Sequence, residues 1–364
     1  MSNDWLVRSE RASQAKHALP QNVATPCFVV FEEDVRTNLL QTAEACGGIE
    51  RLMPHVKTHR AAWVVRLFID HGVTSFKCAT PAEVEMILGA GAQHAVWAYP
   101  TTNRPNIRRV IEAAKQHPDA RVVGMADSWE SLAAWEEALG DAPDNVRLRI
   151  DLDPGLGRTG VAMTNEALLL SKKVYETGRF DGWHFYDGHN RGPKDVRAAA
   201  VERMSAQLES LLRDAEDLNI RGDIIAGGSY SFNLWSPKLV RYVSPGSFTY
   251  PSAPHLTELA DLGWRPSAYV LATVVSTRKG TATLDAGAKA VSPDRPLKER
   301  FQGPGAIVMM NEEHTVVESN DLSIGDQVLL LSGHTCTTCY LYDHALVRTL
   351  EGKWETRPQL GNTR

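Results

Sequence analysis

Short apolar runs alternate along much of the chain with longer segments whose apolar residues recur at helical spacing. Eight of the runs are bounded by turn residues and predict strands: Leu52–Lys57, Ser75–Ala79, Ala95–Tyr99, Arg121–Ala126, Arg147–Asp153, Gly182–Gly188, Asp223–Gly228 and Arg241–Ser247. The segments between them predict helices at Pro81–Gly89, Asn106–Gln116, Ser128–Leu139, Asn165–Thr177 and Asp195–Leu218. Thr80 marks one helix start, because threonine caps a helix and Pro81 suits its first turn.

Strands that alternate with helices predict a parallel sheet, and eight strands are the number that closes a (β/α)8 barrel. An open, doubly wound sheet is the alternative. Barrel enzymes keep their sites at the carboxyl ends of the strands. Unusual polar residues fall in or just after the carboxyl halves of the predicted strands, namely Lys57, Asp153, His184, Tyr186 and His189. We therefore predict an α/β chain whose residues 27–252 form a (β/α)8 barrel.

The pattern changes from about Pro254, where strands separated by turns replace the alternation with helices. The predicted strands are Ala268–Thr277, Thr281–Asp285, Ala306–Met310, His314–Val317, Gln327–Leu331 and Tyr340–Thr349. They indicate a C-terminal all-β domain at residues 253–364. We expect residues 1–26 to join it, because a barrel entered near Cys27 leaves this arm outside.

Composition and charge narrow the class of protein. The chain is 43% hydrophobic and 23% charged, which is typical of a globular protein, and its net charge of −5 gives no basic surface for nucleic acid. No apolar run approaches the roughly 20 residues of a membrane span, and the N-terminus lacks the apolar core of a signal peptide. We expect a cytoplasmic protein. Five cysteines form too sparse a set for a disulfide framework.

Lys57 is the first candidate for chemistry and lies in Pro54-His55-Val56-Lys57-Thr58-His59. A lysine that ends an apolar strand is most often a surface lysine with an apolar stem. It can also point into a barrel mouth, where burial lowers the pKa of a lysine as Schiff-base chemistry requires. The histidines two residues away on both sides weaken the first interpretation, and the spacing alone leaves both open.

Glycine and serine follow the last two predicted barrel strands, in Gly227-Gly228-Ser229 and in Pro245-Gly246-Ser247. Backbone N–H groups at this place in a barrel commonly hold a phosphate group. Each turn alone is an ordinary tight turn, but the two together favour a phosphate site.

His334 and Cys336 are two residues apart in Ser332-Gly333-His334-Thr335-Cys336. On a strand they would project from the same face, so one metal ion could bind both. Imidazole and thiolate favour zinc over magnesium or calcium, and a site with two local ligands would be open and catalytic. A chance pair of polar residues is the alternative. A redox role for Cys336 with Cys339 is less favoured, because no βαβ start follows.

The ordered set of motifs over nearly the whole chain resembles the D-threonine aldolase / D-serine dehydratase family, among the alanine-racemase-like (fold type III) enzymes of pyridoxal 5′-phosphate (PLP). The residues that carry the resemblance are Thr25-Pro26, Pro54–His59, Thr80–Val84, Asp151–Gly160, Tyr186–His189, Gly227–Ser229, Pro245–Ser247, Asp285–Lys289, Glu313-His314 and His334–Cys336. The run Phe248–Ala253 departs from the family pattern, so the contacts near Tyr250 stay open.

The resemblance implies roles for individual residues. It implies that Lys57 holds PLP covalently and that His334 and Cys336 bind a divalent metal, with zinc favoured and manganese the alternative. It also implies a homodimer in which the β-domain of one subunit closes the barrel mouth of the other. The remaining cofactor-side residues that it suggests are Arg158, Tyr186, Gly227, Gly228 and Ser229.

The same resemblance implies a small D-amino acid as substrate. His-x-Cys favours a dehydratase that converts D-3-hydroxy amino acids such as D-serine to a 2-oxo acid and ammonia. A D-threonine aldolase is the alternative, with His59 as the base for the 3-hydroxyl. A racemase is less favoured because racemisation needs no metal. A non-catalytic PLP-binding protein is also less favoured, because such proteins are usually a lone barrel.

Overall fold

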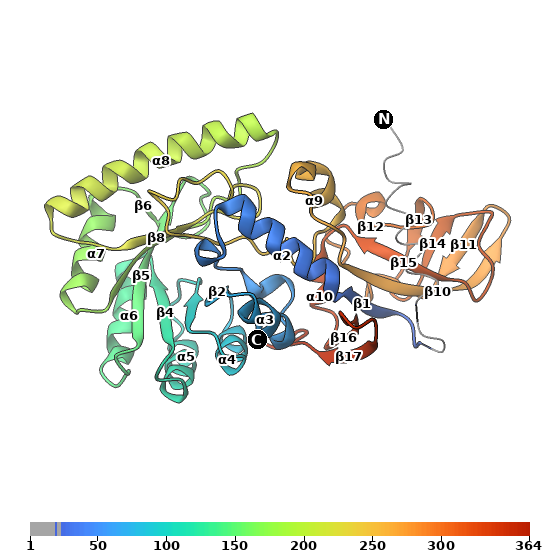
Figure 1. Ribbon diagram of the computed structural model, residues 1–364, viewed down its shortest axis with the longest axis horizontal. Helices are drawn as coiled ribbons and strands as arrows, with labels where there is room; N and C mark the ends of the chain where they lie inside the picture. Colours follow the sequence, from blue (N-terminus) through green and yellow to red (C-terminus); the bar gives the residue numbers. More distant parts are fainter. Residues whose placement is uncertain (1–18, 20–22) are drawn as a thin grey trace. The chain divides into compact units, whose positions relative to one another are not determined.

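A computed structural model describes residue 19 and residues 23–364 (Figure 1). The chain divides into two compact units. The barrel unit comprises Leu39–Phe248 with Thr363–Arg364, and the β unit comprises the described residues up to Asn38 with Thr249–Asn362. Most of the segment 1–26, which we expect to join the β-domain, lies outside the described residues.

The barrel unit is built on parallel strands in the order β2-β3-β4-β5-β7-β8-β9. Residues 52–55 supply the eighth stave, because Leu52 pairs in parallel with Val243 of β9 and His55 with Lys77 of β2. The predicted barrel is therefore confirmed, with seven of the eight predicted strands. The predicted strand Leu52–Lys57 is instead two isolated bridges followed by the 3-10 turn Val56–Thr58. The strands are β2 (Ser75–Cys78), β3 (His94–Trp97), β4 (Arg121–Ala126), β5 (Val146–Asp153), β7 (Phe180–Phe185), β8 (Asp223–Ala226) and β9 (Tyr242–Val243), with β6 (Val161–Ala162) paired to the end of β5.

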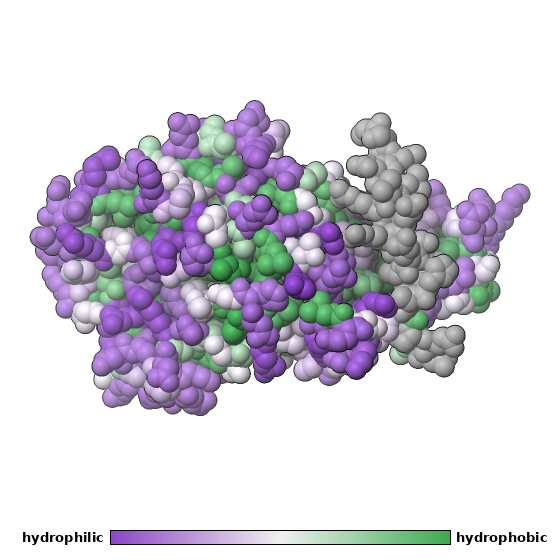
Figure 2. Space-filling model, viewed as in Figure 1, coloured by the Kyte–Doolittle hydropathy of each residue, from purple (hydrophilic) through white to green (hydrophobic). Residues whose placement is uncertain are grey.

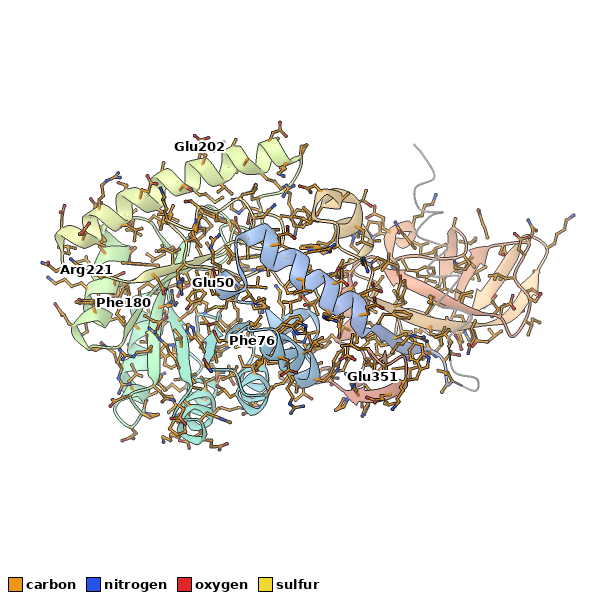
Figure 3. All side chains as sticks on the ribbon, viewed as in Figure 1. Glu50, Phe76, Phe180, Glu202, Arg221 and Glu351 are labelled. Atoms are coloured by element: carbon orange, nitrogen blue, oxygen red, sulfur yellow. The ribbon has the colours of Figure 1, made fainter. Side chains whose placement is uncertain are left out.

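Helices follow the strands and lie outside them (Figure 1). Thr80 caps α4 by accepting a hydrogen bond from the Glu83 N–H, as the sequence predicts. Glu202 stands on the outer side of α8 (Figure 3), and hydrophilic side chains cover most of the visible surface of this unit (Figure 2). The helices are α3 (Ala62–Asp70), α4 (Pro81–Gly89), α5 (Arg104–Gln116), α6 (Trp129–Leu139), α7 (Asn165–Glu176) and α8 (Lys194–Asp217). Helix α2 (Glu32–Cys46) begins in the β unit and ends in the barrel unit.

The barrel interior is filled by apolar side chains from different strands. One fully buried cluster comprises Met53, Val96, Val123, Met125 and Ile225. These residues come from the closing stave, β3, β4 and β8, so the cluster joins staves that are far apart in sequence. Burial of such side chains, at about 1.5–3 kcal/mol each, gives the barrel its core.

The β unit is a nine-stranded sheet in the order β13-β14-β11-β10-β1-β16-β17, with β15 pairing β10 and β12. The predicted C-terminal all-β domain is confirmed as a fold, with two short helices, α9 (Ala253–Glu258) and α10 (Thr335–Cys339). The strands are β1 (Cys27–Phe31), β10 (Ala268–Arg278), β11 (Thr281–Leu284), β12 (Phe301–Gln302), β13 (Ile307–Met310), β14 (Thr315–Glu318), β15 (Gln327–Ser332), β16 (His344–Arg348) and β17 (Trp354–Pro358).

Strand β1 belongs to this sheet, which differs from the predicted start of the barrel at residue 27. It pairs antiparallel with β10 and parallel with β16. Just before it, Thr25 Oγ1 donates to Asp285 Oδ2 over 2.5 Å. An apolar run of this kind predicts a strand, but the sheet that the strand joins depends on distant partners.

In the part of the chain that the structure describes, no helix combines the length and the apolar character that a membrane crossing requires.

Candidate active site

Lys57 lies in a single 3-10 turn, Val56–Thr58, directly after the closing stave of the barrel. Val56 and Thr58 are buried, whereas the Lys57 side chain is exposed. Its ammonium nitrogen is 5.6 Å from the centre of the Tyr186 ring, which follows β7. Tyr186 lies at the carboxyl end of β7, so this contact places the Lys57 amine at the end of the barrel where the sequence predicts it.

The turn that carries Lys57 is packed against the turn after β9. His55 N–H donates to the Pro245 carbonyl over 3.0 Å. A Cβ atom at Gly246 would lie 2.6 Å from the His55 carbonyl oxygen, so a residue without a side chain is required there. The two turns therefore hold each other in place.

The second glycine turn, Gly227-Gly228-Ser229, follows β8 and meets the first. Ser229 Oγ accepts hydrogen bonds from the N–H groups of Gly246 and Ser247, at 3.3 Å and 3.1 Å. The Asp187 carboxylate accepts from the Gly228 N–H over 3.1 Å and so fixes the turn from the β7 side. Two backbone N–H groups thus converge on an oxygen atom, as they would on a phosphate oxygen.

Tyr186 is the centre of a group of cations. Its ring is 4.9 Å from the guanidinium carbon of Arg158 and 5.6 Å from the ammonium nitrogen of Lys77, besides its contact with Lys57. Cβ atoms at Gly188 and Gly228 would overlap the ring at 2.2 Å and 2.8 Å, so both glycines leave it room. The structure thus brings together predicted residues from three loops.

The loop that carries Arg158 is shaped by carboxylates. Asp153 Oδ1 accepts from the N–H groups of Gly155 and Gly157 at 2.9 Å and 3.1 Å. Asp127 accepts from Gly160 N–H over 3.1 Å at the end of the loop. Short aspartates close turns in this way.

Lys77, in the middle of β2, is a residue that the sequence analysis did not single out. Its Nζ lies 2.9 Å from His184 Nε2 and donates to Ser244 Oγ over 2.8 Å. Burial, and next the nearby Lys57 charge, lower the pKa of Lys77 to about 7. A lysine inside an otherwise apolar predicted strand is the signal that could have found it.

His59 is fully buried. Its ring packs edge-on against Phe68 with the ring centres 6.0 Å apart, and its Nδ1 accepts from the Ala61 N–H over 3.2 Å. Burial lowers the pKa of His59 to about 3, so the ring is neutral near pH 7. The role of His59 as a base stays a prediction.

His334 and Cys336 lie in the β unit and are not on a strand. His334 caps the N-terminus of α10 and Cys336 is in the helix, so the two do not alternate along a strand. The side chains of His334 and Cys336 are hydrogen-bonded. This bond to the Cys336 sulfur is the main cause that raises the pKa of His334 to about 9, and Asp294 adds to it.

Asp294 contacts His334 of this pair. Its Oδ2 bonds with His334 Nδ1 and accepts from Thr337 Oγ1, the latter over 3.2 Å. Among the described residues no group of three or more His, Cys, Asp or Glu side chains is arranged to hold a metal ion. Imidazole and thiol suit zinc, so this pair fits a metal as a two-ligand site with open positions.

Two family models match the chain. The alanine racemase N-terminal domain matches residues 32–254, and the model described as "Putative serine dehydratase domain" matches residues 267–348. The first covers more than half of the chain. The protein therefore belongs to the alanine-racemase-like family of fold type III PLP enzymes. No curated protein sequence matches the chain.

Solved structures share the fold. D-threonine aldolase from Filomicrobium marinum has a TM-score of 0.82 at 20% identity, over 92% of this chain and 95% of that one. D-threo-3-hydroxyaspartate dehydratase from Delftia sp. HT23 has a TM-score of 0.80 at 20% identity, over 93% and 98%. Alanine racemase from Clostridium difficile 630 has a TM-score of 0.73 at 12% identity, over 93% and 99%.

Proposed function

We propose that this protein is a PLP- and metal-dependent dehydratase of D-3-hydroxy amino acids such as D-serine, which yields a 2-oxo acid and ammonia. The observation that carries the proposal is the position of Lys57, beside Tyr186 and the two glycine turns, in a chain of the fold type III family. Two of the solved structures with the same fold are lyases of D-amino acids by name.

The residues at the barrel mouth fit PLP. Lys57 supplies an exposed amine, and the N–H groups of Gly246 and Ser247 already point at one oxygen atom. Arg158 and Tyr186 would flank the cofactor, and Gly227, Gly228 and Ser229 would bind its phosphate. These assignments rest on the placement of groups of suitable chemistry around Lys57.

When bound, PLP supplies an electron sink for bonds at the α-carbon of an amino acid. In the proposed dehydratase, the Lys57 amine takes the proton from the α-carbon. His334 and Cys336 would hold a divalent ion, zinc by preference, whose chemistry is Lewis-acid assistance to the departing 3-hydroxyl group. The released enamine hydrolyses to the 2-oxo acid and ammonia. Asp294, bonded to His334, would orient its ring.

A product assay tests the proposal. PLP-loaded protein is mixed with D-serine, D-threonine and D-threo-3-hydroxyaspartate, with and without a chelator. A 2-oxo acid with ammonia, lost on chelation, supports the metal-dependent dehydratase. Glycine with an aldehyde would refute it in favour of the aldolase, for which the neutral His59 is the proposed base.

Replacement of Lys57 tests the cofactor assignment directly. Lys57→Ala should lose the absorbance of PLP bound through a lysine, because it removes the exposed amine that lies beside Tyr186 at the barrel mouth. The same band in the variant would sink the assignment. The exposed Lys115→Met on α5 serves as the control.

We also propose that the protein is a cytoplasmic homodimer, on the basis of its family. Size-exclusion chromatography with light scattering tests the dimer. A monomer at working concentration would contradict it.

A further inference from the structure

Lys77 is buried in the barrel interior, with 3% of its surface exposed. A buried ammonium group is costly, and replacement of buried charges by apolar residues is often neutral or stabilising. Stability therefore gives no reason for a lysine at this position. Its neighbours point instead to the cofactor site.

A chain of hydrogen bonds orients Lys77. Thr159 Oγ1 donates to Asp151 Oδ2 over 3.0 Å, and Asp151 Oδ1 lies 2.6 Å from His184 Nδ1. Burial, and next the Lys77 charge, lower the pKa of His184 to about 4, so its ring is neutral and carries one N–H. A carboxylate only accepts, so Nδ1 donates to Asp151 and Nε2 accepts from Lys77.

Because Lys77 donates to His184 and to Ser244, one hydrogen of its ammonium group is left for a ligand. An ammonium group has three N–H donors, and those of Lys77 reach His184 and Ser244. Among the described residues no further acceptor for Lys77 is found. Both of these partners are protein groups that are themselves held in strands or turns of the barrel.

The surroundings of Lys77 carry surplus positive charge. Lys57, Lys77 and Arg158 all lie within 5.6 Å of the Tyr186 ring centre. Asp151 and Asp187 are the carboxylates that act on Lys77, and both are already bonded to other donors. Three cations against two engaged carboxylates favour binding of an anion.

We propose that Lys77 is a second functional lysine of the Lys57 site, and that its ammonium group binds an anionic oxygen of a molecule held in the barrel mouth. The oxygen is the phenolate of PLP or the carboxylate of the substrate. The proposal rests on the proposed PLP function. His184 and Asp151 act as positioning residues for Lys77.

Two variants of Lys77 and one control test the proposal in the full chain. Lys77→Met removes the charge at similar size, Lys77→Arg keeps a charge, and Lys115→Met changes an exposed lysine. Loss of a charge-assisted hydrogen bond should weaken binding about tenfold or more. The dissociation constant of PLP and the KM for D-serine are measured for each variant, and thermal unfolding checks the fold.

The two sources of the oxygen give different results. If Lys77 binds the phenolate, Lys77→Met weakens PLP binding in the absence of substrate. If it binds the carboxylate, PLP binding stays unchanged and the KM for D-serine rises by a similar factor. Values within twofold of the wild type for both constants, in a folded variant, would overturn the proposal. An absence of PLP binding in the wild-type protein would instead overturn the proposed function together with it.

The pH dependence separates function from structure. Lys77 is charged below about pH 7 and loses its charge above it, so wild-type affinity for the anion should fall from pH 7 to pH 9 relative to Lys77→Arg. If the affinities of the wild type and of Lys77→Arg depended on pH in the same way, the proposal would be contradicted. This comparison does not need Lys77→Met, so it can be made even if that variant does not fold. The charged or titratable groups that face Lys77 are His55, Lys57, Asp151, Arg158, His184 and Asp187.

Discussion

At the scale of single residues, the backbone at Gly246 lies so close to the turn that carries Lys57 that only glycine fits there. A Cβ at Gly246 would lie 2.6 Å from the His55 carbonyl oxygen and 3.2 Å from Thr58 Oγ1. These atoms belong to the turn that carries Lys57. A small side chain must therefore displace the turn or the strand end, and neither is at a free surface.

Gly246→Ala should destabilise the protein by about 1–3 kcal/mol and weaken PLP binding, because the Lys57 turn must shift. Urea unfolding and a PLP titration measure the two effects. Gly89→Ala is the matched control, since no heavy atom lies within 4 Å of the new Cβ and alanine suits the end of α4. Equal stability of Gly246→Ala and the wild type would refute the packing argument.

Some residues of the site can be predicted from the sequence and others cannot. Lys57 and the glycine turns stand at the ends of apolar runs, so local pattern and barrel rules predict their neighbourhood. Lys77 stands inside such a run, and its contact with His184 joins β2 to β7. No local pattern predicts that two distant strands bring these side chains within hydrogen-bond distance.

At the scale of elements, α10 shows where local preference loses to tertiary contacts. Its sequence Thr-Cys-Thr-Thr-Cys is rich in β-branched residues, which favour a strand. The helix is held from outside: Ser252 Oγ accepts from the Thr335 N–H over 2.8 Å, and Thr338 Oγ1 accepts from the Ser292 N–H over 3.1 Å. The shared role of His334 and Cys336 stays a prediction from their spacing, and the helix that carries Cys336 was not predicted.

The metal site should depend on this short helix. His334→Ala and Cys336→Ser are each expected to lose bound zinc, because a two-ligand site cannot hold the ion with one ligand. Metal analysis of protein purified with added zinc gives the stoichiometry.

Cys339→Ala is the matched control for that experiment. It changes a buried cysteine of the same helix that does not take part in the proposed site. It should keep the wild-type zinc content even if it lowers stability. Zinc retained by both His334→Ala and Cys336→Ser would place the metal elsewhere.

At the scale of the whole molecule, the barrel was predictable because its information is local and repeated. Each strand and each helix is predicted by the spacing of its own apolar residues, and eight repeats of strand and helix predict a closed barrel. The assignment of β1 failed for the opposite reason. Its partners β10 and β16 are more than 200 residues away in the chain, and an apolar strand fits either sheet.

The barrel unit also buries several histidines, and this makes its stability depend on pH. Burial is the first cause that lowers the pKa of His59 and of His94 to about 3 and of His184 to about 4. In the unfolded chain a histidine has a pKa of about 6.5. The unfolded state therefore binds protons first as the pH falls.

The free energy of unfolding falls as the pH falls, because the unfolded state binds more protons than the folded state. Well above pH 6.5 these histidines are unprotonated in both states, and the full stability is present. As the pH falls below 6.5, each buried histidine costs up to about 1.4 kcal/mol per pH unit until its folded pKa is reached. Carboxylates titrate mostly below about pH 5, so the loss between pH 6.5 and pH 5 reports histidines.

His94→Gln isolates one of these contributions. The His94 ring is bonded to Ser75 Oγ at 3.3 Å and lies edge-on to Tyr242 at 5.9 Å, away from Lys57, so the change spares the proposed site. Its free energy of unfolding should fall about 1 kcal/mol less than that of the wild type between pH 7 and pH 5.5. Urea titrations at both pH values measure the difference, and the exposed His344→Gln on β16 should retain the wild-type loss. If His94→Gln lost as much stability as the wild type, His94 would have to accept a proton in the folded protein, and its burial would not hold it neutral.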